Sequence, residues 1–375
     1  MKLLNVFLVL LVAMALSSCN VNKQNKVTDG NVTDSLTQDG DVANEVPQKE
    51  EGLVDVQSPD VNFSWVDYEQ KVFRLNGVDY FVFQDKEICV IGYKNPPRNM
   101  KIPNKIAMHY NTYPVRKISE GAFKNCNSIV SLELPPNIKS ISSNAFKSCR
   151  NLKSVIFNDS LQYIGDNAFE DCEALISEIF IPNSVEYIGK KAFYYCFSLQ
   201  SVVLGNGIGE IKDYVFANCT RLTSIEIPNC IHTIGIGAFD GCKGLVSINI
   251  PDKVSHIGNG AFSDCRSLVS VNIPERVEEI AFSLFYNCES LTTIVIPKNV
   301  EVIGEMAFYD CNKLEKIVSL NTTPPRLERS AFSMVSSDSK RMLFVPKESL
   351  GDYDASQWAN YFGLIGEYRG SNIEE

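Results

Sequence analysis

Nine cysteines recur along this sequence at a nearly constant spacing. Of the side chains that recur in it, the thiol has the widest range of chemistry. Each cysteine stands three residues after a phenylalanine, and successive phenylalanines of the series are 23 or 24 residues apart. The nine positions are Cys126, Cys149, Cys172, Cys196, Cys219, Cys242, Cys265, Cys288 and Cys311. Such thiols could form disulfides, ligate a metal, or serve as small buried groups that donate weak S–H hydrogen bonds.

The pattern favours structural thiols over metal ligands or disulfides. Structural zinc sites use paired Cys-x-x-Cys ligands and histidines, whereas this sequence has no such pair and only His109, His232 and His256. Disulfides between neighbouring units are the alternative, but nine is an odd number and the Cα spacing would have to suit them. We therefore predict thiols buried in the protein interior, with no metal and no cofactor.

No catalytic motif accompanies the cysteines. The sequence has no glycine-rich phosphate loop, no nucleophile elbow and no His-Glu-x-x-His. A column of hydroxyl residues follows the repeat, without a neighbouring base to activate it: Ser131, Ser154, Ser201, Ser224, Ser247, Ser270 and Thr293. We predict that the protein has no catalytic residue and is not an enzyme.

The cysteines belong to a longer repeat that must position them. Each unit reads Ile-Gly-x-x-Ala-Phe-x-x-Cys-x-x-Leu-x-Ser-Ile-x-Ile-Pro, with small variations. In one unit the alternation predicts a strand with Ile225 and Ile227 on one face, and Pro228 ends it because proline has no N–H for a further ladder bond. A 23-residue unit cannot enclose a core of its own, so the units must stack, with their strands in one parallel sheet.

Stacking brings the phenylalanines into a continuous internal row. Its members are Phe123, Phe146, Phe169, Phe193, Phe216, Phe239, Phe262, Phe285 and Phe308, followed by Phe332 in the last unit. At roughly 1.5–3 kcal/mol for each buried phenylalanine, we predict that this row is the main support of the fold.

Taken together, these motifs resemble the BspA-like leucine-rich repeats of bacterial surface proteins, also called the Treponema pallidum type. The resemblance covers 115–332 and extends into "LFVPKESLGDYDASQWANYFGLIGEY", which is similar to the closing segment of such arrays. It implies a leucine-rich repeat solenoid of about ten 23-residue repeats, capped at both ends, with a curved parallel β-sheet on its concave face. Other leucine-rich repeats place Asn or Cys at the cysteine position, where the side chain hydrogen-bonds the backbone.

The N-terminus has the features of an exported lipoprotein. "MKLLNVFLVLLVAMALSSC" has one lysine, an apolar run and small residues, which is typical of a signal peptide. "LSSC" resembles the bacterial lipobox, which implies cleavage before Cys19 and lipidation of its sulfur. We predict a lipoprotein signal peptide over 1–18 and a disordered tether over 19–62, where large apolar residues are scarce.

The remaining boundaries follow from the repeat and its ends. We predict an N-terminal cap over 63–111, the repeat array over 112–333 and a C-terminal cap over 334–375. The cap at the start contains Asn76-Gly77 between two alternating runs, a strong β-hairpin signal. Trp65 and Trp358 are expected to pack over the two ends of the core.

The outward strand positions are the candidate ligand-binding residues. They are Glu133, Ile156, Phe180, Val203, Glu226, Asn249, Asn272 and Val295. Ile156, Phe180 and Val203 form an apolar patch between two glutamates, and such patches often mark interaction sites. The alternative is that β-branched and aromatic residues simply suit strands. A one-residue insertion nearby leaves open which way Phe180 faces.

Two functions remain open from the sequence. The family resemblance implies adhesion, so the first is a lipid-anchored cell-surface protein that binds a protein or glycoprotein of the extracellular matrix, a mucin or another cell. The second is a structural scaffold on the periplasmic face, because "CNVNKQNK" lacks the acidic residues that often follow the lipidated cysteine of surface lipoproteins. We predict an outer membrane location, with membrane contact through the lipid only. A net charge of −10 without a basic stripe disfavours nucleic acid.

Overall fold

The computed structural model describes residues 52–58, 61–84, 86–108, 110–332 and 341–370. The repeats lie in one compact unit, Val54–Glu375. The predictions for the signal peptide, for Cys19 and for most of the tether fall outside the described residues. Within those residues, no helix is long and apolar enough to cross a membrane.

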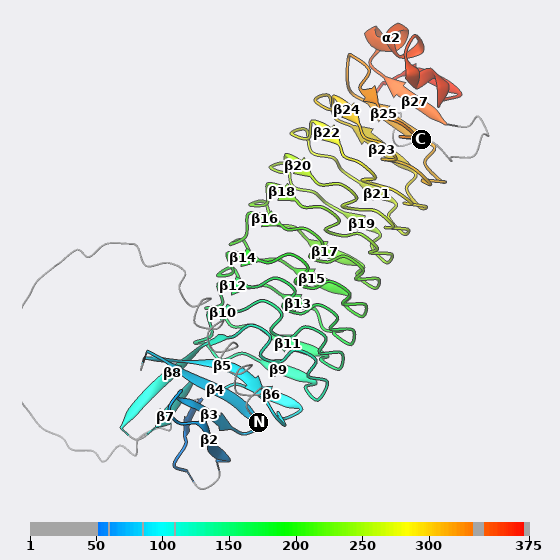
Figure 1. The fold of residues 1–375 in the computed structure, drawn as a ribbon. Coiled ribbons are helices and arrows are strands. Elements are labelled where there is room, and N and C mark those ends of the chain that lie inside the picture. The colour runs from blue at the N-terminus through cyan, green and yellow to red at the C-terminus, as the bar shows by residue number, and fades with distance from the viewer. Residues whose placement is uncertain (1–51, 59–60, 85, 109, 333–340, 371–375) are drawn as a thin grey trace, which may run out of the picture. The chain divides into compact units, whose positions relative to one another are not determined.

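Each repeat contributes two short strands, which stack into two parallel ladders along the solenoid (Figure 1). The strands of the predicted ladder are β9 (Ser131–Glu133), β11 (Ser154–Ile156), β13 (Ile179–Phe180), β15 (Ser201–Val203), β17 (Ser224–Glu226), β19 (Ser247–Ile248), β21 (Ser270–Val271), β23 (Thr293–Ile296), β25 (Lys316–Ser319), β27 (Met342–Val345) and β28 (Leu364–Glu367). Within this ladder Ser201 is paired with Ser224 and Val203 with Glu226, one unit apart. The predicted solenoid of 23-residue units with parallel strands is therefore confirmed.

The second ladder was missed by sequence reasoning. It consists of two-residue strands that end five residues before each stacked phenylalanine, at an isoleucine or, in the last unit, at a leucine: β10 (Ser140–Ile141), β12 (Tyr163–Ile164), β14 (Tyr187–Ile188), β16 (Glu210–Ile211), β18 (Thr233–Ile234), β20 (His256–Ile257), β22 (Glu279–Ile280), β24 (Val302–Ile303) and β26 (Arg326–Leu327). Two residues are too few to show a period of two, so the alternation rule cannot find such strands.

The part of the chain before the repeats is built mostly from longer strands. These are β1 (Leu53–Asp55), β2 (Phe63–Asp67), β3 (Val72–Leu75), β4 (Val78–Phe83), β5 (Glu87–Tyr93), β6 (Asn99–Lys101), β7 (Lys105–Met108) and β8 (Asn111–Ile118). The strands from β2 to β5 pair antiparallel, with Asn76 and Gly77 at positive φ in the turn between β3 and β4. β5 pairs parallel with β8, which in turn pairs with β10 and so continues into the repeats.

The segment around each stacked phenylalanine forms a third row of hydrogen bonds. Residues two before and two after the phenylalanine have positive φ, as at Tyr214 (57°) and Asn218 (60°). With this alternation every second N–H group points to the next unit, while the N–H groups in between, such as that of Ala217, donate within their own unit. In one unit Gly237, Phe239 and Gly241 donate their N–H groups to carbonyls of the following unit at 2.8–2.9 Å. Every described unit repeats this direction, so the row has a fixed polarity along the array.

The phenylalanine row forms a continuous stack inside the solenoid. Neighbouring ring centroids from Phe123 to Phe332 are 5.1–5.8 Å apart, with interplanar angles of at most 15°. Tyr93 stacks on the first ring at 5.9 Å, and Trp358 contacts the last at 5.6 Å. Trp65 lies on β2 and contacts Phe73 instead.

The C-terminal end is closed by short helical segments and by β27 and β28. The helical segments are η1 (Lys347–Ser349), α2 (Leu350–Asp354) and η2 (Gln357–Asn360). Trp358 is buried and donates its indole N–H to the Pro325 carbonyl at 2.8 Å, while the hydroxyls of Tyr353 and Ser319 lie 2.6 Å apart. The last rings of the core are therefore covered by side chains whose polar groups are paired.

Candidate functional site

The nine thiols of the repeat lie in the core and hydrogen-bond backbone carbonyls. From Cys149 to Cys311, each sulfur donates to the carbonyl of the phenylalanine one unit earlier, at 3.0–3.4 Å. The first thiol, Cys126, lies 3.3 Å from the Ser128 hydroxyl. None of the nine is in a disulfide. Within the described residues, no cluster of His, Cys, Asp and Glu is arranged to hold a metal.

Burial makes these thiols unreactive. It raises the pKa of Cys149 and of Cys219 from 9.0 to about 12, and it raises the pKa of Cys172, Cys196 and Cys242 as well. The thiolate is the nucleophilic form, so a raised pKa leaves almost none of it at neutral pH. The repeated cysteines therefore contribute to packing and hydrogen bonding.

The predicted strand-face residues differ in how much surface they offer. Glu133, Ile156, Phe180, Glu226, Asn249 and Asn272 are exposed, whereas Val203 and Val295 are half-buried. Asn272 is already engaged, because its side-chain amide makes two hydrogen bonds of 2.7–2.8 Å with the backbone of Ile250. The accessible apolar part of this face therefore lies in the N-terminal half of the array.

The orientation of Phe180, open from the sequence, is outward. Its register places it beside Val203 on β15, and its side chain is 59% exposed. The extra residue of this unit falls before β13 and interrupts the ladder, since β11 and β13 belong to different sheets although they are neighbours. Ile156 on β11 is 61% exposed, and Ile176, just before the inserted residue, is 46% exposed. We call Ile156, Ile176 and Phe180 the apolar patch.

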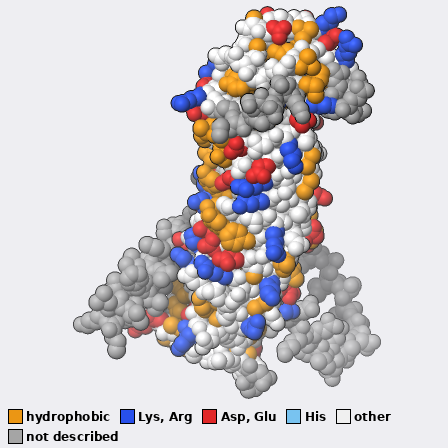
Figure 2. Space-filling view, turned by 90° about the vertical axis from the view of Figure 1, so that its right-hand side faces the viewer, with side chains coloured by type: hydrophobic (Ala, Val, Ile, Leu, Met, Phe, Trp, Pro, Cys, Tyr) orange, Lys and Arg blue, Asp and Glu red, His pale blue; other side chains and the backbone are white. Residues whose placement is uncertain are grey.

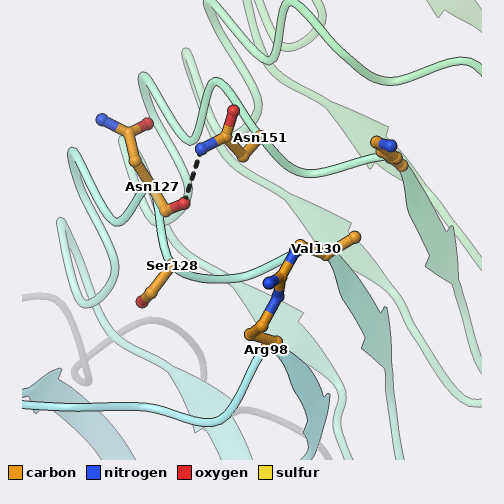
Figure 3. Close-up of a pocket in the computed structure, with 6 residues that line it drawn as sticks. Arg98, Asn127, Ser128, Val130 and Asn151 are labelled. Carbon is orange, nitrogen blue, oxygen red and sulfur yellow. Dashed lines mark hydrogen bonds between the residues drawn. The ribbon is translucent and has the colours of Figure 1, made fainter.

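A groove of about 500 Å³ lies at the start of the adjacent strands. Its lining residues are Arg98, Asn127, Ser128, Val130, Asn151 and Lys153. Figure 3 shows Arg98 beside Val130, with Asn127 and Asn151 on neighbouring loops, where the Asn151 amide donates to the Asn127 carbonyl at 2.8 Å. Two of the lining side chains are cationic and none is acidic, so the groove favours a negatively charged or carbonyl-rich group.

The groove and the apolar patch are contiguous. Ile176 donates its N–H to the Lys153 carbonyl at 3.2 Å, so the patch begins where the groove ends. Beyond the groove, Lys101 pairs with Glu133 at 2.9 Å, and both side chains are exposed. The side of the solenoid seen in Figure 2 carries hydrophobic side chains among charges of both signs, not a field of one sign.

Sequence reasoning missed Arg98, Val130, Lys153 and Ile176 as surface residues. All four precede a strand of the predicted ladder, so they share one place in the unit. The unbroken run of apolar and basic side chains at that place ends after Ile176, because the next two units carry Gln200 and Thr223 there.

Comparison with known proteins places the repeats in one family. The profile described as the BspA type leucine rich repeat region matches in six copies, over residues 105–223 and 209–338, which together span more than half of the chain. The comparison with curated proteins found no match.

Several solved structures are similar to this chain. A leucine-rich cell surface protein from Faecalibacterium prausnitzii is 23% identical over 81% of this chain and 96% of its own, with a TM-score of 0.36. The pneumococcal vaccine antigen PcpA is 18% identical over 80% of this chain and 99% of its own, with a TM-score of 0.41. The Treponema pallidum leucine-rich repeat protein is 24% identical over 67% of this chain and 91% of its own, with a TM-score of 0.32.

Proposed function

The chain belongs to the BspA-type leucine-rich repeat family, and from this premise we propose that it is a lipid-anchored adhesion protein of the cell surface. Its ligand is a protein or glycoprotein of the extracellular matrix, of mucus or of another cell. Lipid on Cys19 holds the protein on the outer membrane, and the segment that follows gives the solenoid its reach.

The observation that carries the proposal is the apolar patch. Ile156 and Phe180 are 61% and 59% exposed on a strand face whose neighbouring exposed positions are Glu133 and Glu226. Clustered exposed apolar side chains with a polar border are typical of protein interaction sites. An aromatic residue at the centre of such a cluster is the usual anchor of binding energy.

The groove adds a charge preference to the patch. Arg98 and Lys153 lie on its lining, and Asn127 and Asn151 add amide groups nearby. A partner with an apolar segment flanked by carboxylates or other anions would fit both features. Its apolar segment would contact the apolar patch, and its anionic groups would lie in the groove. Cations at the border raise the association rate and select the partner, while the apolar contact supplies most of the affinity.

Binding of the full chain to immobilised mucin and to basement-membrane extract tests the patch. The double variant Ile156→Ser, Phe180→Ser should weaken binding at least about tenfold, or about 1.4 kcal/mol, because it removes the anchor. Val246→Ser is the matched control, since Val246 is 49% exposed outside the patch. Equal loss in both variants, or no loss in either, would count against the patch as the binding site.

Protease shaving of intact cells tests the location. Loss of the protein from unbroken cells supports adhesion at the cell surface. Protection until the outer membrane is opened would favour a scaffold on the periplasmic face, which the absence of acidic residues after Cys19 also favours.

A further inference from the structure

A second hollow lies on the turn segments that carry the stacked phenylalanines, away from the strand face. It has a volume of about 320 Å³. Its principal lining side chains are Tyr214, Asp240, Asn259, Ser263, Phe282 and Tyr286. They come from successive units, so the hollow runs along the array. Its size is at the small end of the range of ligand sites.

Missing side chains open this hollow. Gly260 has a φ of 59°, and a Cβ built there would have only the Ser263 Cβ within 4 Å, at 3.6 Å. Other units place Asn144, Lys191 and Met306 at the same position with the same sign of φ. The backbone therefore does not require glycine at residue 260, and any larger residue would project into the open space.

Aromatic rings form the two walls. On one side the Tyr214 ring lies over Gly237, where an added Cβ would be 2.3 Å from its Cε1. On the other side Phe282 is 45% exposed, and Tyr286 is half-buried with its ring stacked on Tyr309 at 5.4 Å. Packing thus holds two of these rings in place before any ligand arrives, which lowers the entropic cost of binding.

The polar groups of the hollow include acceptors but no cation. Asp240 is half-buried and hydrogen-bonded by the Ser263 hydroxyl, and desolvation raises its pKa. Asn259 is exposed and offers an amide. No lysine or arginine lines the hollow. A carboxylate needs hydroxyl or N–H donors from its ligand, and the absence of cations disfavours anionic ligands.

The backbone of the hollow is already paired, which disfavours an extended peptide. Gly237 and Gly260 donate their N–H groups to the carbonyls of Asn259 and Phe282, each at 2.9 Å. A peptide strand cannot add to such an edge. A proline-rich peptide suits aromatic grooves but supplies few N–H donors for Asp240, since proline has none.

We propose that this hollow is a binding subsite for a neutral glycan. A pyranose ring has apolar C–H faces for Tyr214, Phe282 and Tyr286 and hydroxyls that can donate to Asp240 and pair with Asn259. The subsite is separate from the apolar patch and does not depend on the adhesion proposal. The glycan can belong to a glycoprotein or to a bacterial polysaccharide, since both present the same neutral rings.

A glycan array probed with the full chain identifies the ligand, with neutral mucin-type oligosaccharides and neutral bacterial polysaccharides as its two arms. Gly260→Met should reduce affinity for the bound glycan at least tenfold by filling the hollow. Gly121→Met is the matched control, because Gly121 has a φ of 62° at the same position of another unit and nothing lies within 4 Å of its added Cβ. Tyr286→Ala and Asp240→Asn should each weaken binding at least fivefold.

The outcomes separate clearly. Loss in Gly260→Met, with binding unchanged in Gly121→Met and in the Ile156→Ser, Phe180→Ser variant, supports the subsite. Binding of no neutral glycan by the unaltered protein overturns the proposal. Retention of full affinity by both Gly260→Met and Tyr286→Ala overturns it as well. Unfolding curves of each variant show that lost binding is not lost folding.

Discussion

The sulfur of Cys242 donates to the carbonyl oxygen of Phe216 at 3.2 Å, across the boundary between two repeat units. The same oxygen accepts the N–H of Cys219 from its own unit, also at 3.2 Å. From Phe123 to Phe285, each stacked phenylalanine thus ties two units together twice, through its ring and through its carbonyl. The cysteine supplies a compact donor that reaches this oxygen from the next unit.

Replacing Cys242 with alanine should lower the free energy of unfolding by about 1–3 kcal/mol, because a buried carbonyl loses a donor and a small void opens. Urea unfolding followed by circular dichroism measures the change. Cys230→Ala is the control for burial, since the Cys230 sulfur also donates to a carbonyl of the preceding unit, that of Ile208 at 3.0 Å, but is half-buried and should cost less. An equal cost at both positions would contradict a special role for the row.

Stability should fall as pH rises above about 9. The pKa values of Cys149 and Cys219 are raised from 9.0 to about 12, so the folded state keeps protons that the unfolded state loses. Their contribution is complete below pH 9 and is lost as pH rises toward 12, at about 1.4 kcal/mol per pH unit for each thiol. Urea midpoints between pH 7 and 10.5 in reductant measure the decline. A Cys149→Val, Cys219→Val variant should decline less steeply, and an unchanged slope would refute the assignment.

Alkylation should distinguish the thiols of the native protein by burial. Among the described cysteines, Cys230 should react first because it is only half-buried, while Cys172 and Cys242, which are buried and whose pKa values are raised by desolvation, should react only on unfolding. Peptide mass spectrometry after timed labelling measures the order. Modification of the row at the rate of Cys230 would show that the solenoid opens far more readily than its packing implies.

Removal of one stacked phenylalanine ring should destabilise the units next to it and not the whole array. Phe239→Ala removes a fully buried ring stacked at 5.8 and 5.5 Å on its neighbours and should cost about 3–5 kcal/mol. Units contact only their neighbours, so unfolding should separate into two steps on either side of the substitution. Thermal unfolding monitored by calorimetry tests this. Phe282→Ala, at an exposed ring, should leave a single transition, and the same result for Phe239→Ala would contradict the nearest-neighbour account.

Sequence reasoning found the features that repeat with large side chains and missed those made by the backbone or by absent atoms. The row from Phe123 to Phe308 and the strand alternation at Ile225 follow directly from spacing. The two-residue strands such as Thr233–Ile234 were missed, because their pairing depends on the stacked neighbours and not on a local pattern.

The two surface sites show the same limit. Phe180 was found because it occupies a strand position that the repeat defines. The hollow at Gly260 is lined by residues of four successive units, and its aromatic rings stand at different offsets from the stacked phenylalanines, with Tyr214 two residues before Phe216 and Tyr286 one residue after Phe285. Aligning the units by their phenylalanines does not bring these rings into one column, so only the fold brings them together.

The N–H groups that join the phenylalanine segments of neighbouring units all donate in one direction along the array. Every interior unit therefore makes the same bonds, but the two ends of the array differ. Shifting the chain by one unit maps each bond of the row onto the next, as Phe216 to Ala238 maps onto Phe239 to Ala261. Duplication of a single interior unit therefore needs no new partner anywhere, and the array can lengthen during evolution without being redesigned. The two ends cannot be exchanged, because the first unit presents carbonyls, and the Tyr93 hydroxyl donates to that of Lys124 at 3.3 Å.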